Sequence, residues 1–211
     1  DKNNKLIGMI TADDILTVLK EEAEEDALKL AGVQDEAITD NAVKITKKRF
    51  VWLLINLFTA VIASYVIGLF DGNIQKVVAL AVLMPIVASM GGNAATQTLT
   101  VTVRLIATKE LTAENLFKII GKEFSVGFLN GILFSLISGL FVYFWFYEIK
   151  LSILIAVSMV INMACAGLSG IAIPVILDKL KIDPAIASTV FVTTVTDVVG
   201  FVSFLGLAGI I

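Results

Sequence analysis

The chain of 211 residues has no histidine, one cysteine and three prolines. The absence of histidine excludes hydrolysis by a Ser-His-Asp triad, Cys-His proteolysis, HExxH zinc chemistry and haem held by histidine. The single thiol, Cys165, excludes an intrachain disulfide and a cysteine-based zinc cluster. A formal net charge of −3 gives no basic footprint for nucleic acid. We therefore expect neither an enzyme nor a nucleic-acid-binding protein.

Charge is scarce as well. Charged residues make up 17% of the chain, against about 25% in soluble domains. Hydrophobic residues make up 57%, against roughly 45–50% in soluble domains, and the mean hydropathy is +0.92. A soluble domain of this composition would have too little polar surface to stay dispersed. The composition predicts an all-α membrane protein surrounded by lipid.

Two compositional halves meet near residue 50. The first is polar, and the second contains five apolar runs that reach the ~20 helical residues needed to cross a bilayer core of about 30 Å. The second run exceeds that length, which predicts a tilt, a kink at Pro85 or a break near Gly91–Gly92. The expected spans are 50–70, 74–108, 122–147, 151–177 and 184–211.

Loop charge predicts the orientation of these spans. Ten lysine and arginine residues flank one side, namely Lys44, Lys47, Lys48, Arg49, Arg104, Lys109, Lys118, Lys122, Lys179 and Lys181. Only Lys76 and Lys150 flank the other side. The positive-inside rule then predicts a multi-pass protein of the plasma (inner) membrane, with a cytoplasmic N-terminus and an external C-terminus.

The polar half is expected to be mainly helical. Thr11 is a candidate N-cap, with acidic residues in the next turn, and Gly32 is a candidate C-cap. A second helix at about 35–49 leads into the first span. Residues 5–10 resemble the end of a strand whose sheet lies upstream. Since the chain begins without a methionine, we expect it to be a fragment of a longer protein.

Asp197 lies near the middle of the last expected span. A charged group at this depth costs about 2.5–3.5 kcal/mol on insertion scales and is by default a functional candidate. Three threonines and Gly200 make the surrounding stretch polar and narrow. We interpret Asp197 as a cation ligand in a pathway. The alternative is a protonated carboxyl that hydrogen-bonds a neighbouring helix and serves packing alone.

A second polar stretch, residues 91–100, lies in the second expected span. It contains two glycines, one asparagine, one glutamine and three threonines. Asn93 and Gln97 are four residues apart and share a helix face. The glycine pair could free backbone carbonyls, which is tolerated at membrane depth where they line a watery cavity or are buried in protein. Small-residue helix packing is the alternative.

The available ligands are one carboxylate, amide oxygens, hydroxyls and carbonyls. This set suits hard cations such as Mg²⁺ or Ca²⁺ better than Zn²⁺ or Cu⁺. One aspartate per chain supplies little charge for a divalent ion, and a two-fold dimer with its axis along the pore would supply two. Because Mg²⁺ loses water reluctantly, we expect it to be bound partly hydrated.

A third feature is acidic. Residues 21–26 contain five carboxylates in six positions. Such a run is either a solvated helix face or a sensor for divalent ions, since bound cations would relieve the repulsion and could dock the helix on the membrane domain. Asp183, at the cytoplasmic start of the last span, is the possible partner from the other side.

These motifs in combination resemble the MgtE family of magnesium channels. The resemblance rests on residues 91–97 after Pro85, on residues 196–201 and on the five-span plan, while residues 6–16 resemble the last strand and helix of a CBS domain. It implies a CBS remnant at 1–31, a cytoplasmic linker (plug) helix at 32–49 and a pore domain at 50–211. The upstream N-terminal domain and most of the CBS pair would lie outside this chain.

The resemblance further implies a homodimer whose pore lies on the two-fold axis, between spans two and five. Asp197 of each chain would hold a hydrated Mg²⁺, and Asn93 would line the same pore. The other expected pore-lining residues are Gly91, Gly92, Gln97, Thr193, Thr196 and Gly200. Cytosolic Mg²⁺ would close the channel through a second set of ligands, Asp14, Glu22, Glu25, Asp26 and Asp183.

Two other functions remain open from the sequence. A secondary carrier for another divalent cation or a small solute would also use a mid-membrane acid. A membrane anchor or signalling module without transport would not need Asp197. An intramembrane protease is disfavoured, because a single mid-membrane aspartate without histidine forms no catalytic dyad within one chain.

Overall fold

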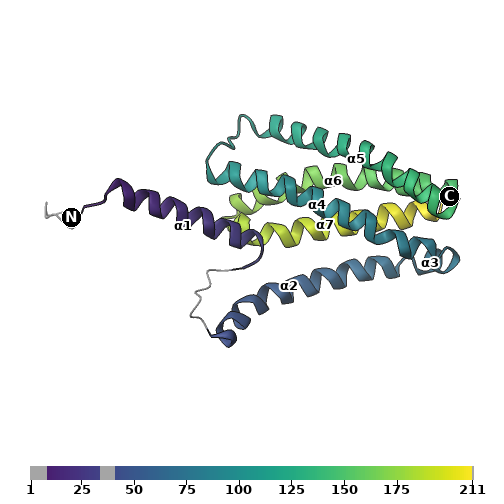
Figure 1. Ribbon diagram of the computed structural model, residues 1–211, viewed down its shortest axis with the longest axis horizontal. Coiled ribbons are helices and arrows are strands. Elements are labelled where there is room, and N and C mark those ends of the chain that lie inside the picture. The colour runs from purple at the N-terminus through teal and green to yellow at the C-terminus, as the bar shows by residue number, and fades with distance from the viewer. Residues whose placement is uncertain (1–8, 34–40, 211) are drawn as a thin grey trace.

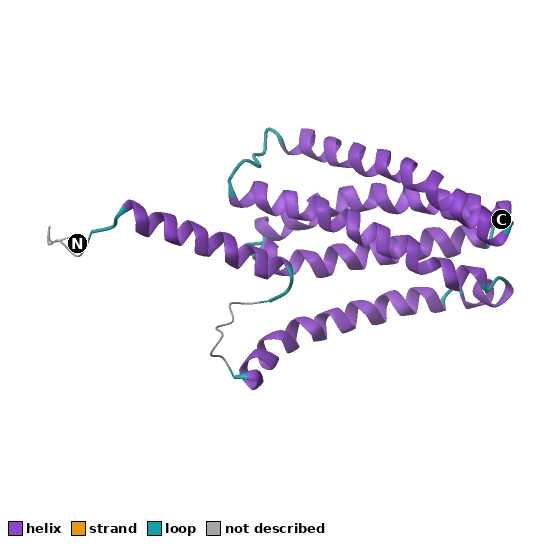
Figure 2. Ribbon diagram, in the orientation of Figure 1, coloured by secondary structure: helices purple, strands orange, loops and turns teal. Residues whose placement is uncertain are grey.

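The computed structural model describes residues 9–33 and 41–210. The expected strand end at 5–10 and the start of the helix expected at 35–49 therefore fall largely outside the described residues. Within the described ranges the protein is all helical, with no strand (Figure 2). The helices are α1 (Ala12–Leu30), α2 (Ala42–Gly68), α3 (Asp71–Lys76), α4 (Ala79–Ala107), α5 (Leu116–Phe146), α6 (Ile149–Lys179) and α7 (Pro184–Ala208) (Figure 1).

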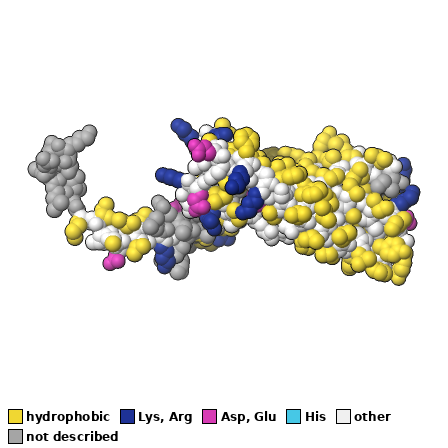
Figure 3. All heavy atoms as spheres, turned by 90° about the horizontal axis from the view of Figure 1, so that it is seen from above, with side chains coloured by type: hydrophobic (Ala, Val, Ile, Leu, Met, Phe, Trp, Pro, Cys, Tyr) yellow, Lys and Arg dark blue, Asp and Glu magenta, His cyan; other side chains and the backbone are white. Residues whose placement is uncertain are grey.

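Five of these helices, α2 and α4 to α7, are long and apolar enough to cross a membrane. The prediction of five spans is confirmed. They have 25 to 31 residues each, so at 1.5 Å per residue the shortest is about 38 Å long and exceeds a ~30 Å hydrocarbon core. Hydrophobic side chains cover the helical body, and most of the visible lysine and arginine side chains gather toward the end that carries α1 (Figure 3).

The second span differs from expectation in two ways. Its polar start forms a separate short helix, α3, and α4 begins only at Ala79. The break considered near Gly91–Gly92 does not occur, because α4 continues to Ala107 through both glycines and through Pro85. Gly91 instead leaves room for a neighbour: a Cβ there would lie 2.2 Å from Nδ2 of Asn162.

Residues 42–49 belong to the same helix as the first span. Asn41 is the N-cap of α2, and its side-chain oxygen accepts a hydrogen bond from the Val43 N–H at 3.4 Å. The basic residues 47–49 therefore occupy early turns of a continuous α2 of 27 residues. This helix packs beside α7 and leans away from the bundle toward its first turn, so that Ala63 is the one buried residue among those described in α2 (Figure 1).

The core lies around α6, which carries more buried residues than any other described helix. Helices α4, α5 and α7 all pack against it. Helix α5 approaches closely at two glycines: a Cβ at Gly127 would lie 2.5 Å from the Met163 carbonyl oxygen, and one at Gly167 would lie 2.6 Å from the Glu123 carbonyl oxygen. Only glycine permits this backbone contact.

The caps expected for α1 are confirmed. Thr11 accepts a hydrogen bond from the Asp14 N–H at 3.2 Å. Gly32 has φ +71° just after the last turn, and the N–H groups of Gly32 and Val33 donate back to the Lys29 and Leu28 carbonyls at 2.9 and 3.0 Å. This is a Schellman ending, which favours glycine at the left-handed position. Helix α1 ends beside α7, at the end of the bundle where α7 begins (Figure 1).

Candidate ion-pathway site

Asp197 is the fourteenth of the 25 residues of α7, so it lies at mid-membrane depth. Its side chain is partly buried, and no group among the described residues donates a hydrogen bond to its carboxylate. The neighbouring threonines do not fill this role, because the hydroxyls of Thr193 and Thr194 donate to backbone carbonyls of α7 at 2.9 and 2.6 Å. The carboxylate is thus available to a cation or its water.

Helix α4 carries a polar stripe on its exposed side. Asn93, the fifteenth of 29 residues, lies at the middle of the helix. The hydroxyls of Thr96 and Thr100 donate one turn back along α4, each at 2.8 Å, so their lone pairs remain free to accept. Hydrocarbon cannot satisfy such groups, so the stripe is suited to water or to another polar surface. The stripe consists of the exposed residues Ser89, Asn93, Thr96, Gln97 and Thr100.

Asn162 of α6 holds the two site helices together, and sequence reasoning missed it. It is fully buried, and its Nδ2 donates to the Val87 carbonyl of α4 at 2.8 Å. A Cβ at Gly91 of α4 would lie 2.2 Å from Nδ2 of Asn162, and a Cβ at Gly200 of α7 would lie 2.8 Å from it. The available signal was a single asparagine within the apolar run of α6, which lacks the cluster of polar residues found at 91–100.

The contacts of Asn162 with α4 and α7 lie at nearly the same depth in the membrane as the site residues. Asn93 is two residues from Gly91, and Asp197 is three residues from Gly200. At 1.5 Å per residue, each lies within about one helical turn of the level at which Asn162 joins α4 to α7. The polar stripe and the acidic group are therefore fixed at the same depth by a single buried side chain.

The residues expected to line a pore divide into two groups. Asn93 and Gln97 are exposed, and Gly92, Thr193 and Asp197 are partly exposed. A Cβ at Gly92 would meet nothing within 4 Å. The other three, Gly91, Thr196 and Gly200, are buried within the chain. Gly91 and Gly200 lie against the Asn162 side chain.

Comparison with known proteins decides the family. Residues 84–207, which include the polar stripe and Asp197, match the MgtE family of divalent cation transporters. The chain belongs to the MgtE family. That description is of a transporter rather than an enzyme.

Three curated relatives carry the name magnesium transporter MgtE. The relative from Bacillus subtilis is 34% identical over 209 residues, which are 99% of this chain and 46% of the relative. Those from Enterococcus faecalis and Thermus thermophilus are each 33% identical, over 99% of this chain and 46% and 47% of the relatives. The chain spans about half the length of the curated relatives it matches.

In this MgtE-family chain a lysine lies between two of the expected sensor residues. The Lys29 ammonium is 2.9 Å from a Glu25 carboxylate oxygen and 3.0 Å from Oδ2 of Asp183. Hydrogen bonds to Glu25 and then to Asp183 raise the pKa of Lys29 above its usual value, so it stays charged. Nearby, the Thr189 hydroxyl donates to the Leu30 carbonyl at 2.9 Å. These contacts join the end of α1 to the start of α7.

Asp183 has a second role as the N-cap of α7. Its Oδ1 accepts a hydrogen bond from the Ala185 N–H at 2.9 Å, and Pro184 takes the first helical position, as the sequence predicts. One carboxylate therefore caps α7 and binds α1 at the same time.

Asp14 lies at the far end of α1. Its carboxylate accepts hydrogen bonds from the Thr11 N–H and hydroxyl at 2.9 and 2.7 Å, which lower the pKa of Asp14. Eleven residues of helix separate Asp14 from Glu25, or about 16 Å, so one ion cannot bind both within one chain. The side chains of Glu22 and Asp26 lie outside the described part. Among the described residues, no group of three or more acidic or cysteine side chains could hold a metal ion.

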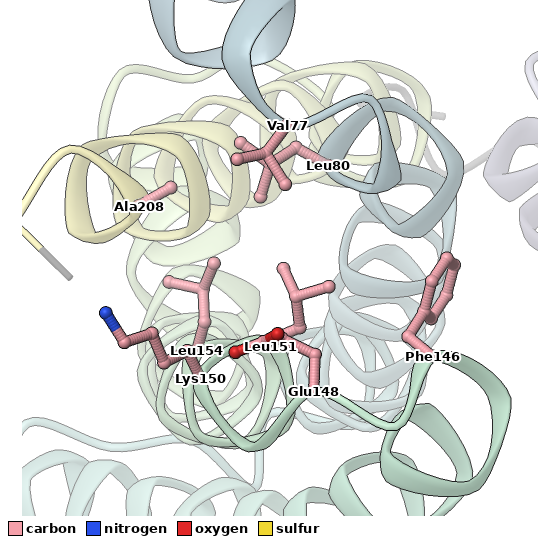
Figure 4. A pocket seen from close by; sticks show the side chains of 8 residues that line it. All are labelled: Val77, Leu80, Phe146, Glu148, Lys150, Leu151, Leu154 and Ala208. Atoms are coloured by element: carbon pink, nitrogen blue, oxygen red, sulfur yellow. The ribbon is translucent and has the colours of Figure 1, made fainter.

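Among the described residues, one cavity lies at an end of the bundle and a second lies beside α4. The larger, about 440 Å³, lies at the end of the bundle opposite α1 and is mostly aliphatic. The side chains of Glu148 and Lys150 stand among its leucines in Figure 4. None of the residues predicted to bind a cation or to line the pore belongs to this cavity. The smaller, about 240 Å³, lies between α4, α5 and α6 and includes Gln97.

Proposed function

We propose that the chain forms the pore domain of a Mg²⁺-selective channel for magnesium uptake. The observation that carries the proposal is an exposed polar stripe on α4 together with the carboxylate of Asp197, to which no described residue donates a hydrogen bond, both at mid-membrane depth. The names of the three relatives give the cation. All donors at the site are oxygens, which Mg²⁺ prefers.

The pore requires a second copy of the chain. A lone Asp197 supplies one negative charge, and an exposed polar stripe in lipid is costly. A two-fold axis parallel to α4 and α7 would bring two stripes and two carboxylates around one water-filled path. Hydrated Mg²⁺ would be bound through its water, because it loses water reluctantly. Asn93, Gln97, Gly92 and Thr193 would line this path, while Gly91, Thr196 and Gly200 would support it from inside the protomer.

The orientation follows from charge. Ten of the basic residues named above flank the end at which α2, α5 and α7 begin, and the positive-inside rule assigns that end to the cytoplasm. The N-terminus would be cytoplasmic and the C-terminus external, in the plasma membrane. We retain 1–31 as a CBS remnant and 32–49 as a linker (plug) segment within this proposal, and α1 would then act directly on the cytoplasmic start of α7.

Cytosolic Mg²⁺ would gate the pore at the contact of α1 with α7. Mg²⁺ bound among Glu22, Glu25, Asp26 and Asp183 would hold α1 against α7 and keep the path closed. Lys29 would occupy this position when Mg²⁺ is low. Asp14 would bind a separate ion or a neighbouring domain, because it is too distant to share the first one.

The carrier alternative receives less support. Carriers commonly place their sites at interrupted helices, whereas α4 and α7 are both continuous through their polar stretches. A carrier would also show uptake that depends on a counter-ion or saturates steeply.

Mg²⁺ uptake into proteoliposomes tests the proposal. Wild-type protein is compared with Asp197→Asn and with Asp178→Asn, which changes an exposed aspartate at the end of α6 outside the site. The proposal expects uptake by the wild type and by Asp178→Asn, with background uptake by Asp197→Asn. Full uptake by Asp197→Asn at equal reconstitution would reject the assignment of the path.

A further inference from the structure

The smaller cavity carries polar chemistry that the central path does not use. It measures about 240 Å³ and lies between α4, α5 and α6. Four of the residues that line it bear oxygen donors, namely Gln97, Thr98, Glu123 and Asn130. No lysine or arginine is among the lining residues. A carboxylate thus lines a cavity of mixed polar and apolar character, with no positive partner among the lining residues.

The position of Glu123 is fixed by its surroundings. It is the eighth residue of α5, about 10 Å along the helix from its start. Its carboxylate accepts a hydrogen bond from the Thr98 hydroxyl of α4 at 3.2 Å. Its backbone is pressed against α6, where a Cβ at Gly167 would lie 2.6 Å from the Glu123 carbonyl oxygen. Glu123 therefore lies just inside the membrane-spanning part of α5, where an ionisable group held in place by two neighbouring helices is a functional candidate.

We propose that this cavity is a second cation site, off the central path, that binds a hydrated divalent cation. One carboxylate, two carboxamides and one hydroxyl form an all-oxygen set, which suits a hard cation. A cation with six waters at ~2.1 Å has a radius of about 3.5 Å and a volume of about 180 Å³. That volume fits within the cavity of about 240 Å³. Direct contact with all four protein groups is therefore unnecessary.

Gln97 connects this cavity to the central path. It belongs to the exposed stripe of α4 and also lines the cavity. A cation leaving the path on the cytoplasmic side could exchange with the off-axis site through this amide. The inference takes the cation from the proposed function, but the site itself is separate from Asp197.

The competing explanation is purely structural. The hydrogen bond from Thr98 to Glu123 could serve only to join α4 to α5, with water filling the cavity. Cation binding separates the two explanations, because a structural hydrogen bond would not change the number of bound ions.

The experiment counts ions on the full chain in lipid nanodiscs. Mn²⁺ serves as the probe, and the fall in the electron paramagnetic resonance signal of free hydrated Mn²⁺ gives the number bound per chain. Glu123→Gln is compared with wild type, with Asp197→Asn and with Glu114→Gln, a control at an exposed glutamate outside the cavity. Asn130→Leu is the second cavity variant, since it removes the amide and keeps the same branched skeleton of side-chain heavy atoms.

We expect Glu123→Gln to lose one bound Mn²⁺ per chain while Glu114→Gln loses none. Asn130→Leu should raise the Kd of that ion at least threefold. Asp197→Asn should lose a different ion and keep the Glu123-dependent one. Equal Mn²⁺ counts and affinities in wild type, Glu123→Gln and Asn130→Leu would overturn the second site. Failure of the central site would appear separately, as unchanged uptake by Asp197→Asn.

Discussion

The start and the middle of α7 each carry an aspartate, and the two carboxylates differ in their hydrogen-bond partners. Asp183, at the start of the helix, is held by Lys29 and by the Ala185 N–H. Asp197, fourteen residues further at mid-membrane depth, has no hydrogen-bond donor among the described residues. A carboxylate in water can take a protein partner or lose it at little cost, whereas one in a membrane is costly and remains there only with a partner of some kind. The contrast is what the proposed function expects, in which a cation or its water is the partner of Asp197.

The first test applies the same substitution at both ends. Asp197→Asn should lower Mg²⁺ uptake at least a hundredfold, because the charge that holds the cation is lost. Asp183→Asn should not lower uptake, since asparagine caps a helix as well as aspartate does and loss of a proposed closing ligand would favour the open pore. Flux into proteoliposomes measures both. Equal loss in the two variants would remove the contrast between the two ends.

The second test concerns the packing beneath the site. Gly91→Ala should lower stability by about 1–3 kcal/mol, the usual cost of overpacking, since the new Cβ would meet the Asn162 side chain. Thermal unfolding in detergent measures the change. Gly92→Ala is the matched control, because its Cβ would meet nothing within 4 Å.

A second substitution, at Asn162, should relieve part of the destabilisation caused by Gly91→Ala. The double variant Gly91→Ala with Asn162→Ala relieves the clash but loses the hydrogen bond to Val87. We expect it to unfold at a higher temperature than Gly91→Ala and still below wild type. A double variant no more stable than Gly91→Ala would show that the clash is not with Asn162.

The third test concerns Asp183 and its contact with Lys29 at the start of α7. Lys29→Met keeps much of the side-chain length and removes the positive charge between Glu25 and Asp183. The freed carboxylates should bind Mg²⁺ more tightly, so that the pore closes at about threefold to tenfold lower cytosolic Mg²⁺, in keeping with an exposed ion pair of ~1 kcal/mol. Inside-out patch recordings with graded Mg²⁺ measure the shift. If the Mg²⁺ concentration that closes half of the channels is unchanged, the contact of Lys29 with Glu25 and Asp183 does not take part in gating.

The smallest expected effect is at the exposed start of α1. Hydrogen bonds from Thr11 lower the pKa of Asp14 in the folded state. A lowered pKa contributes stability above the unfolded value of 3.8, and that contribution is lost as the pH falls through the folded value. Hydrogen exchange of the Thr11, Asp14 and Ile15 amides, which are hydrogen-bonded in this cap, should accelerate below about pH 4 relative to the rest of α1. In Asp14→Asn this acceleration at low pH should be absent. If it persists, another titrating group causes it.

The number of spans and most helix ends were predictable because their causes are local. Apolar length reveals a span, and a cap acts within one turn, as at Thr11, Gly32 and Asp183. The extent of α4 was less predictable. Its glycine pair allows either a break or close packing, and the neighbour that decides between them, Asn162, is 71 residues away from Gly91 in the chain.

The sequence by itself determined that this protein crosses a membrane five times, with an acidic group and a run of amides and hydroxyls at mid-membrane depth. It did so because hydropathy and helical rise set depth residue by residue. Only the tertiary structure decided which side of each helix is covered, and so separated Asn93 and Gln97 on the exposed stripe from Gly91, Thr196 and Gly200 inside. Small and polar residues occur on both sides of α4 and α7, and burial depends on the helix that packs there.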